Sequence, residues 1–197
     1  MQKIKVDLKN IKKSDLDFVI KILKDGKVAV LPTDTIYGLS ALAADEKALK
    51  KIYKIKKREK KKSLLILVKS YCMLKKYCRV SKKQDEYLRK IWPGPVTVIL
   101  QHKGNLPTVL TGGADSVAVR LPKNDFLIKI IKGVDQPLVS TSLNLSGRPV
   151  LDNLAGIEKC FKTAQPDLLV DAGKAKRKKP SRLIDLRDIN NIKILRK

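Results

Sequence analysis

The sequence predicts an α/β fold, a twisted mixed β-sheet flanked by helices. Short apolar runs of strand length recur along the chain, and segments with apolar residues at helical spacing lie between them. Glycine and proline punctuate the junctions. A chain of 197 residues is long enough for one well-buried core and short for two. We therefore expect one domain over residues 1–197.

Helix and strand alternate in the first half of the chain. Ser14 and Asp17 have the spacing of a capping box, and the apolar positions after them predict a helix that Gly26 closes. An apolar strand at 27–31 should end at Pro32, because proline has no backbone N–H. The next expected elements are a helix capped by Asp45 with an apolar stripe at 48–55 and a strand at 64–68. A further helix should run from Ser81 to Ile91, with Gln84 at the capping-box position.

The second half continues the alternation. Residues 92–95, Trp-Pro-Gly-Pro, cannot extend a helix, so a strand at 96–100 should follow. Further strands are expected at 117–121, 138–141, 168–170, 183–186 and 192–195, with helices at 124–132 and 153–163. Residues 172–180 carry five Lys or Arg residues and predict a loop between strands.

The formal charge of +25 predicts attraction to polyanions, either nucleic acid or nucleotide phosphate. Of the 44 basic residues 35 are Lys and nine are Arg, and biased coding alone could enrich lysine. The arginines are more informative, because a chain that drifts toward lysine keeps arginine where a planar, forked donor is needed.

Several site classes are disfavoured. Cys72, Cys78 and Cys160 have no paired spacing and His102 is the single histidine, so neither a disulfide scaffold, a zinc site nor a Ser-His-Asp triad is predicted. Neither the P-loop nor the dinucleotide fingerprint occurs. No apolar run approaches the roughly 20 residues of a membrane span, and the N-terminus lacks a signal-peptide core. We expect a cytoplasmic protein that does not bind membranes.

Three polar clusters are candidates for chemistry. Residues 31–39 place hydroxyls, a carboxylate and a tyrosine directly after a strand, and residues 140–147 place hydroxyls, an amide and a glycine after another. Lys56, Arg58 and Lys62 fall at a helix-to-strand junction, where cations could converge on phosphates. Ordinary turns explain the first two clusters equally well, and Lys47, Lys50, Lys51 and Lys54 are best explained as a solvated helix face.

Seven motifs together resemble the YrdC family in order and spacing, over nearly the whole chain. They are residues 32–39 (PTDTIYGL), Lys56 and Arg58 with Lys62, 92–97 (WPGPVT), 110–112 (LTG), 116–122 (SVAVRLP), 140–147 (STSLNLSG) and 180–181 (PS). The resemblance implies a single-domain YrdC-like fold with a concave basic cavity, in its short bacterial-type form.

The resemblance also implies an L-threonylcarbamoyladenylate synthase, a nucleotidyltransferase. Such an enzyme combines L-threonine, bicarbonate or CO2 and ATP into threonylcarbamoyl-AMP and pyrophosphate, for the N6-threonylcarbamoyladenosine modification of tRNA. Mg²⁺ would arrive with ATP, without a protein-only metal site. Implied partners are downstream tRNA threonylcarbamoyltransferase subunits, and tRNA or other RNA could bind the basic face.

Residue roles follow from the same resemblance. It implies catalytic roles for Lys56 and Arg58, which we expect to be solvent-accessible. The implied ATP-binding set is Lys56, Arg58, Lys62, Thr111, Ser140, Ser142, Asn144 and Arg196. The implied threonine-binding set is Thr33, Thr35, Tyr37, Arg120 and Ser181. Leu67 stands where many longer relatives have a threonine-contacting histidine.

Two alternatives remain open. A YciO-like paralogue would share the fold without an assigned activity, and Leu143, in place of the usual alanine, offers it some support. A non-catalytic RNA-binding protein of the same fold would use the basic face alone, and its affinity should fall steeply with salt.

Overall fold

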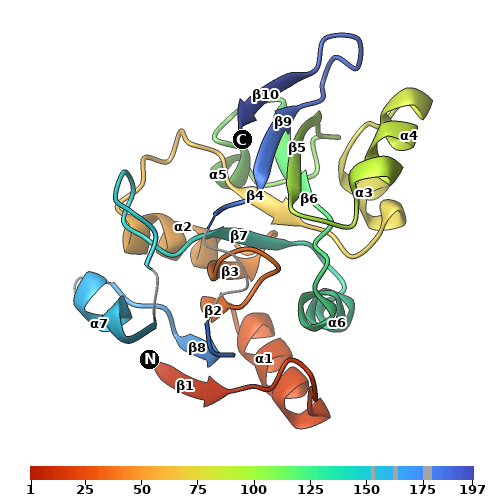
Figure 1. Cartoon of the computed structure of the whole chain (residues 1–197). Helices are drawn as coiled ribbons and strands as arrows, with labels where there is room; N and C mark the ends of the chain where they lie inside the picture. The colour runs from red at the N-terminus through yellow and green to blue at the C-terminus, as the bar shows by residue number, and fades with distance from the viewer. Residues whose placement is uncertain (152–153, 162–163, 175–178) are drawn as a thin grey trace.

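Ten strands form one mixed sheet in the computed structural model, which describes residues 1–151, 154–161, 164–174 and 179–197 (Figure 1). The strand order is β1-β8-β2-β3-β7-β4-β6-β5-β9-β10. The strands are β1 (Gln2–Lys5), β2 (Ala29–Leu31), β3 (Gly38–Leu42), β4 (Leu65–Leu67), β5 (Val96–Gln101), β6 (Ser116–Arg120), β7 (Leu138–Ser142), β8 (Leu168–Asp171), β9 (Arg182–Asp185) and β10 (Lys193–Arg196). The predicted mixed α/β architecture is confirmed.

Helices flank this sheet. They are α1 (Lys13–Lys24), α2 (Glu46–Lys56), α3 (Tyr71–Tyr77), α4 (Lys82–Ile91), α5 (Thr108–Thr111), α6 (Asp125–Val134) and α7 (Ile157–Cys160), the last preceded by a 3₁₀ turn at Leu154–Gly156. Helices α1 and α6 lie side by side next to β2 and β3, while α3 and α4 lie together beyond β5 (Figure 1). A Cβ on Gly133 of α6 would be 2.3 Å from Cδ1 of Ile20, so glycine permits the close approach of α1.

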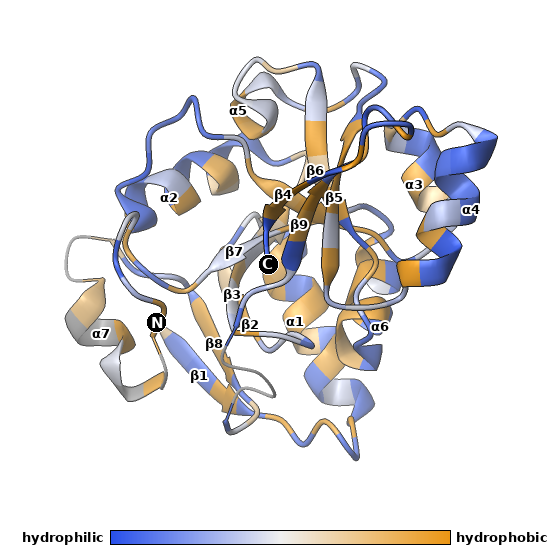
Figure 2. Cartoon of the chain, turned by 45° about the horizontal axis from the view of Figure 1, so that its top comes forward, coloured by the Kyte–Doolittle hydropathy of each residue, from blue (hydrophilic) through white to orange (hydrophobic). Residues whose placement is uncertain are grey.

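The sheet combines parallel and antiparallel pairs around β7. Strand β7 runs antiparallel to both β3 and β4, and Ser140 lies opposite Ser40 on one side and Leu65 on the other. Ile66, Val98, Val119 and Val139 are fully buried. Strands β4 and β6 are mainly hydrophobic, whereas much of α4 is hydrophilic (Figure 2). The core therefore lies around β2 and β7, the two strands that lead into the predicted polar clusters at 31–39 and 140–147.

Two of the three helix caps that the sequence predicts are present. The Asp45 carboxylate accepts the Ala48 N–H at 2.9 Å. Ser81 and Gln84 form a complete capping box. The box predicted at Ser14 is wrong, because α1 begins at Lys13 after Lys12 and has no side-chain cap.

The remaining differences concern short elements. The sequence analysis did not predict β1, β3, α3 or α5. The helix expected at 153–163 is reduced to a 3₁₀ turn and the four residues of α7, and both predicted ends, Asn153 and Thr163, lie outside the described residues. Residues 175–178 of the predicted loop also lie outside them. No helix among the described residues is long and apolar enough to cross a membrane.

Candidate functional site

A cavity of about 420 Å³ lies on one face of the sheet. Its floor is made by alternate residues of adjacent strands, which point to the same face because side chains alternate along a strand. These residues are Leu65 and Leu67 of β4, Thr97 and Ile99 of β5, Ala118 and Arg120 of β6, and Ser140 and Ser142 of β7. The fully buried valines and isoleucine named above fall at the intervening positions. The pleat of the sheet therefore separates a cavity lined by both polar and apolar side chains from the apolar core.

Nine of the thirteen residues expected at the site line this cavity. They are Thr33, Thr35, Tyr37, Arg58, Arg120, Ser140, Ser142, Ser181 and Arg196. The charged residues of the described lining are all arginines, with neither lysine nor carboxylate among them. This agrees with the argument that a lysine-rich chain keeps arginine where its fork is used. Segments separated by more than a hundred residues thus contribute to one cationic surface.

Arg58 and Arg196 are each tethered to the backbone. Arg58 donates from Nη2 to the Ser63 carbonyl at 3.0 Å and from Nε to the Lys62 carbonyl at 3.3 Å. Arg196 donates from Nε to the Ser181 carbonyl at 2.9 Å. Within the described ranges neither guanidinium is paired with a carboxylate. Both are therefore oriented cations whose charge is available to an anion in the cavity.

Arg120, in contrast, is held by Asp34, whose carboxylate belongs to a predicted polar cluster but was assigned no role from the sequence. Its Nη2 donates to Oδ1 of Asp34 at 2.5 Å, and its Nη1 donates to the Thr35 hydroxyl at 3.2 Å. Burial lowers the pKa of Arg120, the Asp34 charge opposes that shift, and the Arg196 charge adds to it. Asp34 lies 86 positions from Arg120 in the sequence, so only the folded chain pairs them.

Lys56 does not line the cavity, and the expectation that it is solvent-accessible is wrong, since it is 1% exposed. Its Nζ donates to the carbonyls of Ser142 at 2.5 Å and Asn144 at 2.9 Å and to Oδ1 of Asn144 at 2.8 Å. These three acceptors match the three hydrogens of an ammonium group. Burial, followed by the Arg58 charge, lowers the pKa of Lys56 to about 7. Lys56 thus anchors the loop after β7 through these three hydrogen bonds.

Asn144 is the second anchor of that loop. Its Oδ1 also accepts the Ser142 hydroxyl at 2.6 Å, and its Nδ2 donates to the Arg148 carbonyl at 2.5 Å. Like Lys56, Asn144 does not line the cavity, whereas Ser142 does. The predicted polar cluster after β7 is therefore one hydrogen-bonded unit.

Two other expected residues lie outside the lining. Lys62 is exposed and pairs with Glu59 at 2.9 Å. Thr111 is buried at the end of α5, where its hydroxyl donates to the Thr108 carbonyl at 3.4 Å. The two segments are nevertheless neighbours, because a Cβ on Gly112 would be 2.4 Å from the Lys61 carbonyl oxygen. Gly112 also has a φ of +65°, which glycine adopts without strain.

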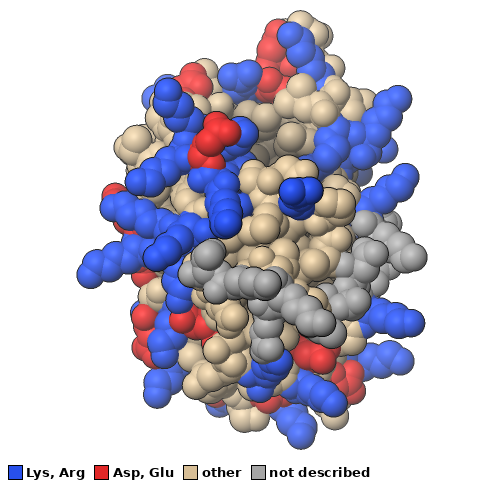
Figure 3. All heavy atoms as spheres, turned by 90° about the vertical axis from the view of Figure 1, so that its left-hand side faces the viewer, with Lys and Arg blue, Asp and Glu red and all other residues tan. Residues whose placement is uncertain are grey.

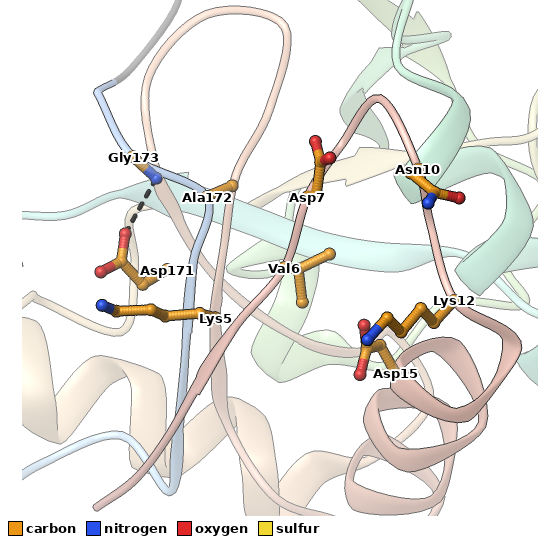
Figure 4. A pocket seen from close by; sticks show the side chains of 9 residues that line it. All are labelled: Lys5, Val6, Asp7, Asn10, Lys12, Asp15, Asp171, Ala172 and Gly173. Atoms are coloured by element: carbon orange, nitrogen blue, oxygen red, sulfur yellow. Dashed lines mark hydrogen bonds between the residues drawn. The ribbon is translucent and has the colours of Figure 1, made fainter.

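Tyr37 connects the cavity to the end of β8. Its hydroxyl donates to the Gly173 carbonyl at 2.7 Å and accepts the Ala172 N–H at 2.9 Å. Ala172 and Gly173 also line a second, more open cavity of about 600 Å³ between β1, α1 and β8 (Figure 4). None of the predicted site residues lines that cavity, and its lysines and aspartates alternate along its rim.

The described residues contain no group of three or more His, Cys, Asp and Glu side chains that could hold a metal ion. One Asp34 oxygen accepts Arg120 of the described lining, and the second oxygen accepts the Lys123 N–H at 3.2 Å. Both Asp34 oxygens are therefore already engaged with the protein.

A family model named Sua5_yciO_yrdC, with the description telomere recombination, matches residues 21–197. A putative threonylcarbamoyl-AMP synthase of Methanocaldococcus jannaschii is 36% identical over 93% of this chain and 86% of its own length. The threonylcarbamoyl-AMP synthase of Klebsiella pneumoniae is 31% identical, over 89% of this chain and 93% of its own.

A longer relative is also similar. The threonylcarbamoyl-AMP synthase of Pyrococcus abyssi is 34% identical over 83% of this chain but 48% of its own length, so this chain spans about half of that protein. The crystal structure of P. abyssi Sua5 complexed with L-threonine superposes with a TM-score of 0.87 at 30% identity, covering 94% of this chain and 54% of that one.

Proposed function

The chain belongs to the Sua5/YciO/YrdC family, and we propose on this basis that it is an L-threonylcarbamoyladenylate synthase. The reaction joins L-threonine, bicarbonate or CO2 and ATP to give threonylcarbamoyl-AMP and pyrophosphate, for N6-threonylcarbamoyladenosine in tRNA. The observation that carries the proposal is the arginine-lined cavity, in which hydroxyl groups lie among three guanidinium groups. Such a cavity suits a small zwitterion beside a polyphosphate.

The chemistry requires positioning rather than a protein nucleophile. The threonine amine attacks CO2 and loses a proton, giving a carbamate. A carbamate oxygen then attacks the α-phosphorus of ATP, and pyrophosphate leaves with the electrons of the broken P–O bond. The carboxylate, carbamate and triphosphate are all anionic, so the protein must hold like charges together and stabilise charge on the phosphoryl oxygens. Oriented arginines in a cavity perform both tasks.

We assign Arg58 to the phosphates as the principal catalytic cation. Ser140, Ser142 and Arg196 lie on the same lining and are assigned to ATP with it. Lys56 and Asn144 are assigned to ATP through the loop that they anchor. Lys62 and Thr111 are assigned to the outer part of the nucleotide, where their two segments meet.

We assign the threonine site to the opposite wall. Arg120 supplies a cation for the carboxylate, and Thr33, Thr35, Tyr37 and Ser181 surround it. The Ser181 hydroxyl lies 2.7 Å from that of Thr97, and its carbonyl accepts Arg196 Nε. The two walls therefore meet at Ser181 and Arg196, where the carbamate would reach the α-phosphate.

The substrate is proposed to be the Mg²⁺ complex of ATP. The described lining has no carboxylate, and the oxygens of Asp34 are taken by Arg120 and Lys123. ATP oxygens and water would then be the main ligands of the ion, as is usual for magnesium nucleotides.

We further propose that the protein acts in the cytoplasm, where ATP and tRNA are available. Its product is a mixed anhydride that water can hydrolyse, so rapid use by tRNA threonylcarbamoyltransferase subunits is expected.

The second candidate function, RNA binding, is favoured by one observation: Lys and Arg side chains crowd the face that contains α2 (Figure 3).

Incubation of the protein with threonine, bicarbonate and Mg-ATP tests the proposal. Pyrophosphate should be released only when threonine is present, and mass spectrometry should detect threonylcarbamoyl-AMP. Release that does not depend on threonine, or no release, would instead support the YciO-like alternative. The shared fold does not distinguish the two, whereas the names of the relatives favour the synthase.

A further inference from the structure

The cavity wall contains a chain of hydrogen bonds whose direction is fixed at both ends. At one end Arg120 Nη1 donates to Thr35 Oγ1 at 3.2 Å, and a guanidinium cannot accept. At the other end Thr33 Oγ1 donates to the Ile36 carbonyl at 2.7 Å, and a carbonyl cannot donate. The two threonine hydroxyls are 3.0 Å apart. The hydrogen between them must therefore belong to Thr35 and point to Thr33.

This direction leaves the two hydroxyls with different capacities. Thr33 Oγ1 donates to Ile36 and accepts both the Thr35 hydroxyl and the Thr35 N–H, the latter at 3.0 Å, so it is saturated. Thr35 Oγ1 has used its hydrogen and one lone pair, and its second lone pair has no partner among the bonds of the described residues. Both residues line the cavity. Thr35 can therefore bond a ligand only as an acceptor.

Asp34 controls the donor end of the chain. Its Oδ1 accepts Arg120 Nη2 at 2.5 Å while its Oδ2 accepts the Lys123 N–H at 3.2 Å, so the carboxylate is itself fixed to the backbone. The side chains of Arg120 and Asp34 are only 5% and 8% exposed. The guanidinium of Arg120 is rigid and planar, so the bond between Nη2 and Asp34 also fixes the direction of Nη1. Nη1 then donates to the Thr35 hydroxyl.

We infer that Asp34 and Thr33 are positioning residues, which make the Thr35 hydroxyl an acceptor for an N–H or O–H group of the amino-acid substrate. The inference rests on the proposed synthase function and adds how the threonine wall recognises its ligand. An acceptor suits an amine nucleophile, because it binds an N–H and leaves the nitrogen lone pair free for CO2. A hydroxyl free to donate would instead occupy that lone pair. The same acceptor could bind the β-hydroxyl hydrogen of threonine.

Steady-state pyrophosphate release tests the inference with threonine and with valine, which is nearly isosteric but lacks the hydroxyl. Thr35→Val should lower kcat/KM for threonine about tenfold, as expected for one lost hydrogen bond, while KM for ATP stays unchanged. If the acceptor binds the side-chain hydroxyl, the preference for threonine over valine falls by the same factor. If it binds the amine, both amino acids lose equally. Either pattern supports the acceptor role.

The positioning residues have their own variants. Asp34→Asn should raise KM for threonine several-fold without raising KM for ATP, because its amide cannot fix the guanidinium by charge. Thr33→Val should lower threonine use, whereas Thr33→Ser, which keeps the hydroxyl, should restore it. Asp17→Asn and Thr108→Val, at exposed positions away from the cavity, are the matched controls and should behave as wild type. Melting temperatures identify variants that fail to fold. If a valine variant fails to fold, the Asp34→Asn variant still tests the inference.

The two proposals fail in different ways. A wild-type protein that releases no pyrophosphate in response to threonine contradicts the synthase function and removes the basis of the inference. An active wild type with folded Thr35→Val and Asp34→Asn variants that keep wild-type KM values for threonine overturns the inference alone. A rise in KM for ATP of the same size as the rise for threonine would also overturn it, since general loosening of the cavity would explain both.

Discussion

Arg58 is the cavity residue whose removal tests phosphate binding most directly, because it is partly exposed and has no carboxylate partner in the described ranges. Arg58→Ala should lower kcat/KM for ATP about 100-fold, the cost of losing one oriented group that stabilises developing charge. Stability should change little. Arg79→Ala, at an exposed position outside the cavity, is the control. Wild-type turnover by Arg58→Ala would remove Arg58 from the mechanism.

Arg120 tests the geometry of the threonine wall. Arg120→Lys keeps a cation but cannot donate to Asp34 and Thr35 from two rigidly spaced nitrogens. We expect KM for threonine to rise at least tenfold while KM for ATP changes much less. Initial rates at varied threonine and saturating ATP measure the difference. An equal change in both constants would contradict the carboxylate role.

Lys56 gives a prediction about stability and pH. The pKa of Lys56 is about 7 in the folded protein, whereas an unperturbed lysine, as in the unfolded chain, has a pKa of 10.5. Between these pH values the unfolded chain therefore binds a proton that the folded chain does not. Stability contributed by Lys56 should therefore rise with pH across this window, by up to about 1.4 kcal/mol per pH unit. Denaturant unfolding of wild type and Lys56→Met from pH 7 to pH 10 isolates the effect. A constant difference between the two proteins would refute the lowered pKa.

The sequence predicted residue types at the site better than their surroundings. The resemblance to the YrdC family implied nine residues that line one cavity, but Asp34 was given no role, because its partner is remote in sequence. Lys56 was expected to be solvent-accessible as a phosphate-binding cation, whereas its burial depends on the carbonyls of a loop 86 residues away. Burial of a charge depends on long-range partners, which local sequence does not reveal.

Helix α4 tests how far a local sequence signal determines an element. Ser81→Ala removes an observed capping box and should destabilise the protein by about 1 kcal/mol. Ser14→Ala changes a serine with the same sequence signature at the start of α1, where no side-chain cap forms, and should cost nearly nothing. Thermal or urea denaturation compares the two. Equal losses would mean that helix propensity, not capping, explains the Ser81 effect.

Local signals were sufficient where short-range bonds define an element, as at Asp45 and Ser81. They were insufficient for β3, which is buried throughout and is stabilised by pairing with β2 and β7. They were also insufficient for β1, a mostly exposed edge strand whose partner β8 lies 166 positions later. Pairing with remote strands, rather than propensity, decides such segments.

At the scale of the whole molecule, the excess of positive charge on the α2 face predicts salt-dependent RNA binding. Lys47, Lys54 and Lys57 are exposed and have no carboxylate partner among the ion pairs of the described residues. The first two are seven residues apart on α2 and therefore share a helix face with the third at its end. Changing all three to Ala should reduce the slope of log affinity against log salt by about 2 to 3.

The matched control removes the same charge elsewhere. Lys82, Lys83 and Lys90 are exposed on α4, on the side of the sheet away from α2 (Figure 1), and their triple Ala variant also lowers the net charge by three. Fluorescence anisotropy with labelled tRNA at several salt concentrations measures both slopes. If the α2 face binds RNA, only the α2 variant changes its slope by the full amount. Equal changes would show that net charge alone attracts RNA, because long-range attraction depends on total charge whereas counterion release depends on the phosphates actually contacted.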